Sequence, residues 1–283
     1  MTDKAGILIE SYNQALEKGY EEIFRNRKEE DILRLRDDKI KELLDKELLK
    51  WEDTPIHDLD NITPKQYFEG LDTIEKVVEV FIQAAKACDK GVPEPLLKRI
   101  IHFEEEITDQ LIKFAYDFYL SQEEEEFYIS LMSVNVLGAI KAEKAIKPLM
   151  RLIYLLDENL EILVEEISDA LVNIGEPCTG NLIEAISSSE QIGYIDEYLL
   201  NTLVRIGKNH KSDEIYKCIK SSFNRMDDKI LGALSLGDYG DGRAIPTLRG
   251  YIEKNINSID NATYKEILAV IKRLGGNIED LKI

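Results

Sequence analysis

The most informative motif of the chain reads Leu236-Gly237-Asp238-Tyr239-Gly240-Asp241-Gly242-Arg243-Ala244-Ile245-Pro246-Thr247-Leu248. A gap-free counterpart reads Leu137-Gly138-Ala139-Ile140-Lys141-Ala142-Glu143-Lys144-Ala145-Ile146-Lys147-Pro148-Leu149. Both begin with Leu-Gly, continue through a short turn, and close with Ala-Ile and a final Leu. Self-similarity of this kind is typical of repeat proteins. The motif therefore predicts that the C-terminal half of the chain is built from one recurring unit.

Degenerate copies of the motif extend the pattern. The equivalent turn positions are Lys141, Gly175, Gly207, Gly240 and Gly275, with spacings of 34, 32, 33 and 35 residues. Each unit is predicted to be a helix, a tight turn and a second helix, with the turn residue in the left-handed conformation that glycine adopts most easily. The second helices carry apolar residues at helical spacing, such as Ile146, Leu149 and Ile153. Because one hairpin cannot bury its apolar face alone, the units must stack on one another.

These repeats resemble the short bacterial HEAT-like repeats, also called phycobilin-lyase-type HEAT repeats, over about residues 125–283. The resemblance rests on the Leu-Gly, Asp and Ala-Ile-Pro-x-Leu positions of residues 236–248. It implies an all-α fold, a right-handed α-solenoid of HEAT-like helical hairpins. The family includes scaffolds, adaptors and a few enzymes, so the repeat implies an architecture and no single activity.

Residues 1–124 are predicted to form an irregular helical region, continuous with the array and holding one degenerate repeat. We expect one helix to about Lys18 and a longer amphipathic helix after Gly19. Thr54-Pro55 and Thr63-Pro64 are typical helix starts, because Thr caps free N–H groups and Pro is tolerated at the next position. Thr63 and Gln66 also fit a capping box.

Charge and composition narrow the function classes. The chain has 283 residues and a formal net charge of −19, and residues 51–130 alone carry twelve more acidic than basic side chains. This balance argues against nonspecific nucleic-acid binding, for which a basic footprint is expected. We find neither an apolar run of membrane-spanning length nor a signal peptide. Three scattered cysteines then indicate a cytoplasmic protein.

The sequence contains no motif that specifies a catalytic, nucleotide or metal site. The histidines and cysteines show none of the spacings of a zinc site, and no glycine-rich phosphate loop is present. We therefore expect a non-enzymatic protein without a cofactor, although a Cys–His nucleophile assembled by the fold stays open.

The second helices of the repeats carry the candidate binding residues. With their apolar residues turned inward, basic side chains and one tyrosine form a stripe on the face that lines the concave side of HEAT-like stacks. Glu184 interrupts this stripe. The predicted groove residues are Lys144, Lys147, Arg151, Tyr154, Lys217, Lys220, Arg243, Arg249 and Lys254.

The leading hypothesis is an interaction scaffold or adaptor that holds a protein partner, such as an acidic peptide or surface, in this groove. The alternative is a DNA-binding protein similar to the HEAT-like alkylpurine DNA glycosylases. The acidic net charge and the position of Trp51 outside the repeats count against it. A phycobilin-lyase-like chromophore protein is a third reading, which rests on the repeat name alone.

Overall fold

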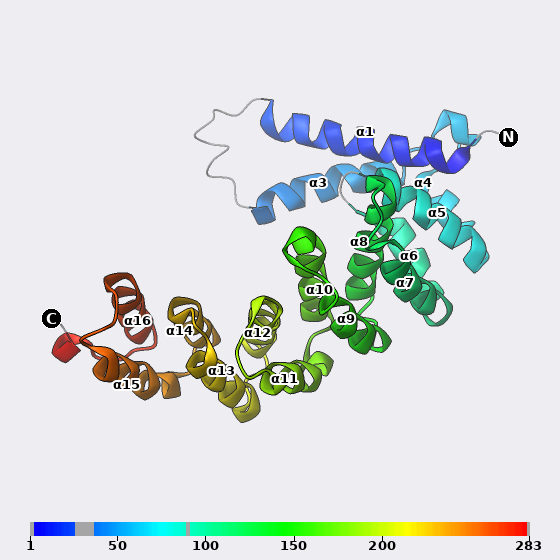
Figure 1. Cartoon of the computed structure of the whole chain (residues 1–283). Coiled ribbons are helices and arrows are strands. Elements are labelled where there is room, and N and C mark those ends of the chain that lie inside the picture. The colour runs from blue at the N-terminus through cyan, green and yellow to red at the C-terminus, as the bar shows by residue number, and fades with distance from the viewer. Residues whose placement is uncertain (1–2, 26–36, 89–90, 282–283) are drawn as a thin grey trace. The chain divides into compact units, whose positions relative to one another are not determined.

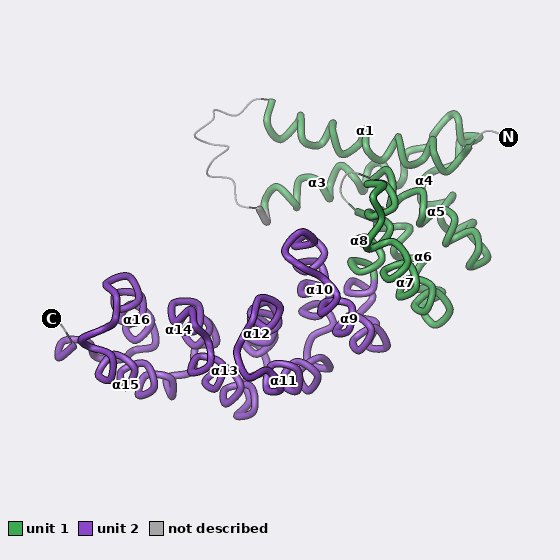
Figure 2. Tube along the Cα trace, viewed as in Figure 1, with its two compact units in different colours: residues 1–136 green, residues 137–283 purple. Residues whose placement is uncertain are grey.

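The computed structural model describes residues 3–25, 37–88 and 91–281, and within them the protein is all-helical. Figure 1 shows the helices in chain order. The chain divides into two compact units, residues 1–136 and residues 137–283 (Figure 2). The division falls inside helix α8, about 12 residues beyond the boundary predicted between residues 124 and 125.

The first unit contains seven α-helices among its described residues. They are α1 (Lys4–Phe24), α3 (Asp37–Glu52), α4 (Pro64–Glu69), α5 (Ile74–Ala87), α6 (Glu94–His102), α7 (Glu104–Phe118) and α8 (Glu124–Ala139). Helices α1 and α3 run side by side in opposite directions (Figure 1). Their contact is fixed by Trp51, whose ring meets Tyr12 edge-on at 5.2 Å and whose Nε1 donates to Ser11 Oγ at 3.0 Å.

Two predictions for the first unit were wrong, and the structure explains each of them. Helix α1 does not end near Lys18 but continues through Gly19 to Phe24. A Cβ on Gly19 would lie 3.0 Å from Leu44, so this glycine permits the close approach of α3. Thr54 starts no helix, since its hydroxyl donates to the Lys50 carbonyl at 2.6 Å and so closes the preceding helix. The predicted longer helix after Gly19 is divided: its first residues belong to α1, its C-terminal part is helix α3 (Asp37–Glu52), and residues 26–36 lie outside the described residues.

The Thr63 capping box is confirmed. The Thr63 hydroxyl accepts from the Gln66 backbone N–H at 3.2 Å, and the Gln66 side chain accepts from the Thr63 N–H at 2.9 Å. This exchange satisfies two of the free donors at the start of α4. The acidic runs that begin near Glu104 and Glu123 likewise lie in the first turns of α7 and α8, where the helix dipole favours negative charge.

The second unit contains two rows of helices. The first-helix row is α10 (Glu161–Ile174), α12 (Tyr194–Gly207), α14 (Lys229–Tyr239) and α16 (Asn261–Arg273). The second-helix row is α9 (Ile146–Ile153), α11 (Thr179–Ser188), α13 (Asp213–Arg225) and α15 (Ile245–Asn255). Each member of the first-helix row packs on the next, α9 packs on α11, and α11 packs on α13 (Figure 2).

The turns between the rows repeat in detail. Single-turn 3-10 helices at Glu143–Ala145, Glu176–Cys178 and Gly242–Ala244 directly precede α9, α11 and α15. Each ends in a small side chain with no exposed surface, namely Ala145, Cys178 and Ala244. The aligned segments therefore share one backbone course and one buried contact, although their sequences have diverged.

Four of the five predicted turn residues have a positive φ angle: Lys141, Gly175, Gly240 and Gly275. Gly207 does not, because α12 continues through it. A Cβ at Gly207 would lie 2.9 Å from the Tyr239 ring, so the small residue is needed for packing and not for a turn. The prediction of a turn at Gly207 was therefore wrong.

The Leu-Gly step of the motif has a packing explanation. A Cβ on Gly138 would lie 2.6 Å from Cα of Ala170 in α10, and a Cβ on Gly237 would lie 2.8 Å from Val270 in α16. Real side chains do not tolerate such distances. Gly138 therefore lets α8 approach α10 closely, and Gly237 lets α14 approach α16 closely. Among the described residues, no helix combines the length and the apolar character that crossing a bilayer requires.

Candidate functional site

The strongest concentration of predicted site residues lies on α9. Its buried residues include Leu149, Leu152 and Ile153, whereas Lys147, Arg151 and Tyr154 are exposed at a spacing that places them on one stripe. The stripe borders a groove of about 610 Å³ between α9 and α11. The remaining lining residues are Met150, Asn181, Glu184, Ala185 and Ser188. We call this feature the α9–α11 groove.

Tyr154 is held in place by a residue of α12. Its hydroxyl donates to Oδ1 of Asp196 at 3.1 Å, and Asp196 is only 7% exposed. The second Asp196 oxygen accepts from the Gly193 N–H at 3.1 Å, at the start of α12. Burial and the nearby Asp196 charge raise the pKa of Tyr154, so the hydroxyl stays protonated and acts as a donor.

The other predicted lysines lie on separate parts of the second unit. Lys144 belongs to the 3-10 turn before α9, Lys217 and Lys220 are exposed on α13, and Lys254 is exposed near the end of α15. None of these four lines the α9–α11 groove.

Arg243 and Arg249 have structural partners that the sequence analysis missed. Arg243 forms ion pairs with Asp213 at 2.6 Å and Asp241 at 2.7 Å, and its guanidinium lies 4.3 Å from the centre of the Tyr216 ring. Arg243 also holds the pKa of Asp241 below its usual value. The charge of Arg243 is therefore already neutralised within the protein, at the turn that precedes α15.

Arg249 bridges α15 to the end of the chain. Its guanidinium donates to the Asn277 carbonyl at 2.6 Å and forms an ion pair with Asp280. Asn277 and Asp280 lie 28 and 31 residues further along the chain. Only packing brings these groups together, so sequence spacing gave no signal for the contact.

A second groove, also missed by the sequence analysis, lies on the first-helix row. It measures about 570 Å³ and is formed by α10 and α12, with Leu231 of α14 at its edge. We call it the α10–α12 groove. Its other lining residues are Glu165, Ser168, Asp169, Tyr194, Glu197, Tyr198, Asn201 and Arg205. The available signal was the spacing of four between Glu165 and Asp169 and between Tyr194 and Tyr198.

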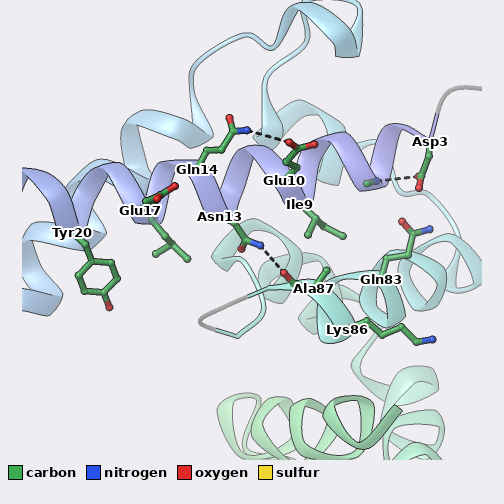
Figure 3. A pocket seen from close by; sticks show the side chains of 12 residues that line it. Asp3, Ile9, Glu10, Asn13, Gln14, Glu17, Tyr20, Gln83, Lys86 and Ala87 are labelled. Carbon is green, nitrogen blue, oxygen red and sulfur yellow. Dashed lines mark hydrogen bonds between the residues drawn. The ribbon is translucent and has the colours of Figure 1, made fainter. Parts of the chain in front are cut away.

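A pocket of the first unit lies between α1 and α5 and measures about 900 Å³ (Figure 3). Several of its polar side chains already make hydrogen bonds. Asn13 donates to the Ala87 carbonyl at 2.6 Å, and Gln14 donates to Glu10 at 3.3 Å. Asp3 caps the first turn of α1 by accepting from the Gly6 N–H at 3.0 Å. These contacts connect or complete helices, so Asp3, Asn13 and Gln14 have a structural role.

Two of the three cysteines, Cys178 and Cys218, are buried thiols. Cys178 is buried, its thiol lies 3.3 Å from the Leu171 carbonyl, and burial raises its pKa to about 12, so it stays a thiol at neutral pH. Burial also raises the pKa of Cys218. No group of three acidic, His or Cys residues in the described part of the chain is placed to hold a metal ion. The single tryptophan, Trp51, is buried in the first unit.

The chain matches no protein-family model, no curated protein and no solved structure. The likeness to HEAT-like repeats therefore stays a prediction from the residues, and the function must be argued from the surfaces described above.

Proposed function

We propose that the protein is a non-enzymatic interaction scaffold, an α-solenoid of HEAT-like hairpins that binds an acidic segment of a protein partner. The observation that carries the proposal is the α9–α11 groove, where Lys147 and Arg151 lie on one exposed stripe beside the anchored Tyr154. Neither cation has a recorded ion pair among the described residues.

The chemistry of these three residues suits an acidic peptide. Arg151 can bind a carboxylate through two parallel hydrogen bonds, and Lys147 adds a second positive charge one helical turn away. Tyr and Arg are enriched among the residues that dominate binding energy. Since the Asp196 hydrogen bond already orders Tyr154, less side-chain entropy is lost when a partner binds.

The charge of the rest of the molecule favours a specific contact. The chain carries 55 acidic and 36 basic side chains, so its net charge repels an acidic partner at long range. Two unpaired cations in one groove then define where such a partner can bind. Lys217 and Lys220 on α13 supply positive charge further along the same row.

The test uses the full chain and fluorescein-labelled 12-residue peptides. One set carries four Glu or Asp residues, and a matched set carries Gln or Asn at those positions. Fluorescence anisotropy at physiological salt should show binding of acidic peptides only. The double charge reversal Lys147→Glu with Arg151→Glu should weaken it by about tenfold or more, as loss of a charged hot-spot pair does.

The matched control is Lys265→Glu with Lys272→Glu, which makes the same change in net charge at two exposed positions of α16. It should leave affinity within about twofold, because screening limits distant charges to small effects. A photocrosslinking residue at Asn181, which lines the groove, should capture the peptide. Equal losses in both double variants, or no crosslink from position 181, would reject the groove.

A further inference from the structure

The α10–α12 groove combines two tyrosine rings with excess negative charge. Tyr194 and Tyr198 meet with ring centroids 5.2 Å apart and an interplanar angle of 70°. The Tyr198 hydroxyl donates to Glu161 at 2.6 Å, which fixes the orientation of its ring. An ordered aromatic face of this kind attracts a cation placed over it.

The charge of the groove is not balanced from within. Arg205 is the only cation that lines it, and its guanidinium is already paired with Asp169 at 2.5 Å. Glu165 and Glu197 remain, and neither has a recorded ion pair among the described residues. The pKa of Glu197 is raised by its partial burial and by the nearby Asp228, so this carboxylate lacks the compensating charge that a cation would supply.

The size and the donor set favour an organic cation over a metal ion. The groove measures about 570 Å³, within the range of sites that hold ligands larger than an ion. The described acidic residues do not come together in threes in a way that could hold a metal. Side-chain cations of a polypeptide fit both the volume of the groove and its tyrosines.

We propose that the α10–α12 groove binds a basic segment of a protein partner, with a Lys or Arg side chain over the Tyr194–Tyr198 rings and near the carboxylates of Glu165 and Glu197. The argument is charge complementarity on an ordered aromatic face. This surface belongs to the first-helix row, so the proposal does not depend on the acidic-peptide site on α9 and α11. If both are correct, the array contacts acidic and basic segments through different helices.

The experiment uses the full chain and a fluorescein-labelled 12-residue peptide with four Lys or Arg residues, together with the same peptide carrying Gln at those positions. The basic peptide should bind at physiological salt and the Gln peptide should not. Glu165→Gln with Glu197→Gln should weaken binding by about tenfold, because it removes the two carboxylates that would contact the cationic side chain. Tyr198→Leu keeps bulk but removes the aromatic face, and should cost about two- to fivefold.

The matched control is Glu214→Gln with Glu253→Gln, which removes two exposed carboxylates from the second-helix row. It should leave affinity within about twofold, because these charges lie outside the groove. A photocrosslinking residue at Asn201 should capture the basic peptide, and one at Asn181 should not.

Equal weakening in the two double variants, or crosslinks from both positions, would show diffuse attraction to an acidic protein and would overturn the proposal. Circular dichroism of each variant separates lost binding from lost folding. Crosslinking of the acidic peptide is measured at position 181 and crosslinking of the basic peptide at position 201. A negative result at one position therefore leaves the result at the other interpretable.

Discussion

The Tyr154 hydroxyl donates a 3.1 Å hydrogen bond to Asp196, a carboxylate that also caps the first turn of α12. The contact joins α9 of the second-helix row to α12 of the first-helix row, 42 residues away in the chain. Tyr154 is nevertheless 48% exposed. The same side chain therefore orders the array and borders the α9–α11 groove, and a test of binding there must separate the two roles.

Tyr154→Phe removes the hydroxyl and keeps the ring. We expect a loss of about 1 kcal/mol of unfolding free energy, because a buried carboxylate loses a donor, and partial exposure of the tyrosine limits the effect. Urea denaturation followed by circular dichroism measures it. Tyr128→Phe is the matched control, since that exposed hydroxyl lies 3.4 Å from Glu124 and should contribute almost nothing. Equal losses in the two variants would contradict a structural role for the Asp196 contact.

Gly138→Ala tests the packing explanation of the Leu-Gly motif. The new methyl group would meet the Ala170 backbone at 2.6 Å, so α10 must move and we expect a loss of about 1–3 kcal/mol. Gly180→Ala in α11 meets no atom within 4 Å and should instead add about 0.5–1 kcal/mol through helix propensity. Thermal unfolding midpoints measure both effects: the midpoint should fall for Gly138→Ala and rise for Gly180→Ala. A neutral Gly138→Ala variant would show that the two helices do not need this close approach.

Glu197→Gln should stabilise the unliganded protein at neutral pH. The pKa of Glu197 is raised in the folded state, so folding favours its protonated form. Below the unfolded pKa of a glutamate, about 4.3, the carboxyl is protonated in both states and carries no penalty. The penalty develops as the pH rises from the unfolded pKa to the folded pKa and is complete above the folded pKa.

The expected gain at pH 7 is no more than about 0.5 kcal/mol, the range of surface substitutions. It should disappear below about pH 4, where wild-type Glu197 is neutral as well. Paired thermal scans of wild type and variant across this pH range measure it. A constant difference at all pH values would show that the charge of Glu197 is not its cause.

Arg243→Ala and Arg249→Ala should leave acidic-peptide affinity within about twofold, since ion pairs within the protein already engage both guanidinium groups. The peptide anisotropy assay measures this directly, with the Lys147 and Arg151 reversals as the positive comparison. A tenfold loss in either alanine variant would return that arginine to the binding surface and extend the site to α15.

Much of the helical framework could be predicted because it depends on short-range contacts. The Thr63–Gln66 capping box and the acidic first turns of α7 and α8 involve residues within four positions of one another. The inward-facing apolar residues of α9 follow from helical periodicity alone. Gly207 shows where this reasoning fails, because a glycine required by the Tyr239 ring looks the same in sequence as a glycine required by a turn.

The candidate sites also contain residues that could be predicted from one helix and contacts that could not. Lys147 and Arg151 were predictable as one stripe because they lie on one helix. The partners of Arg243 and Arg249 were not, since Asp213 and Asp280 come from other helical segments. The α10–α12 groove also needs Glu165 from one helix and Tyr198 from the next.

The sequence by itself determined the helices, three of the four glycine turns and the repeated hairpin, because caps, periodicity and backbone preference act within a few residues. Tertiary structure alone decided which charges remain available to a partner. Packing of one helix on the next joins Arg243 to Asp213 and Arg205 to Asp169, and it leaves Lys147, Arg151, Glu165 and Glu197 without an ion pair among the described residues. The physical reason is that a charge is neutralised by whatever lies within a few ångströms in space, at any distance along the chain.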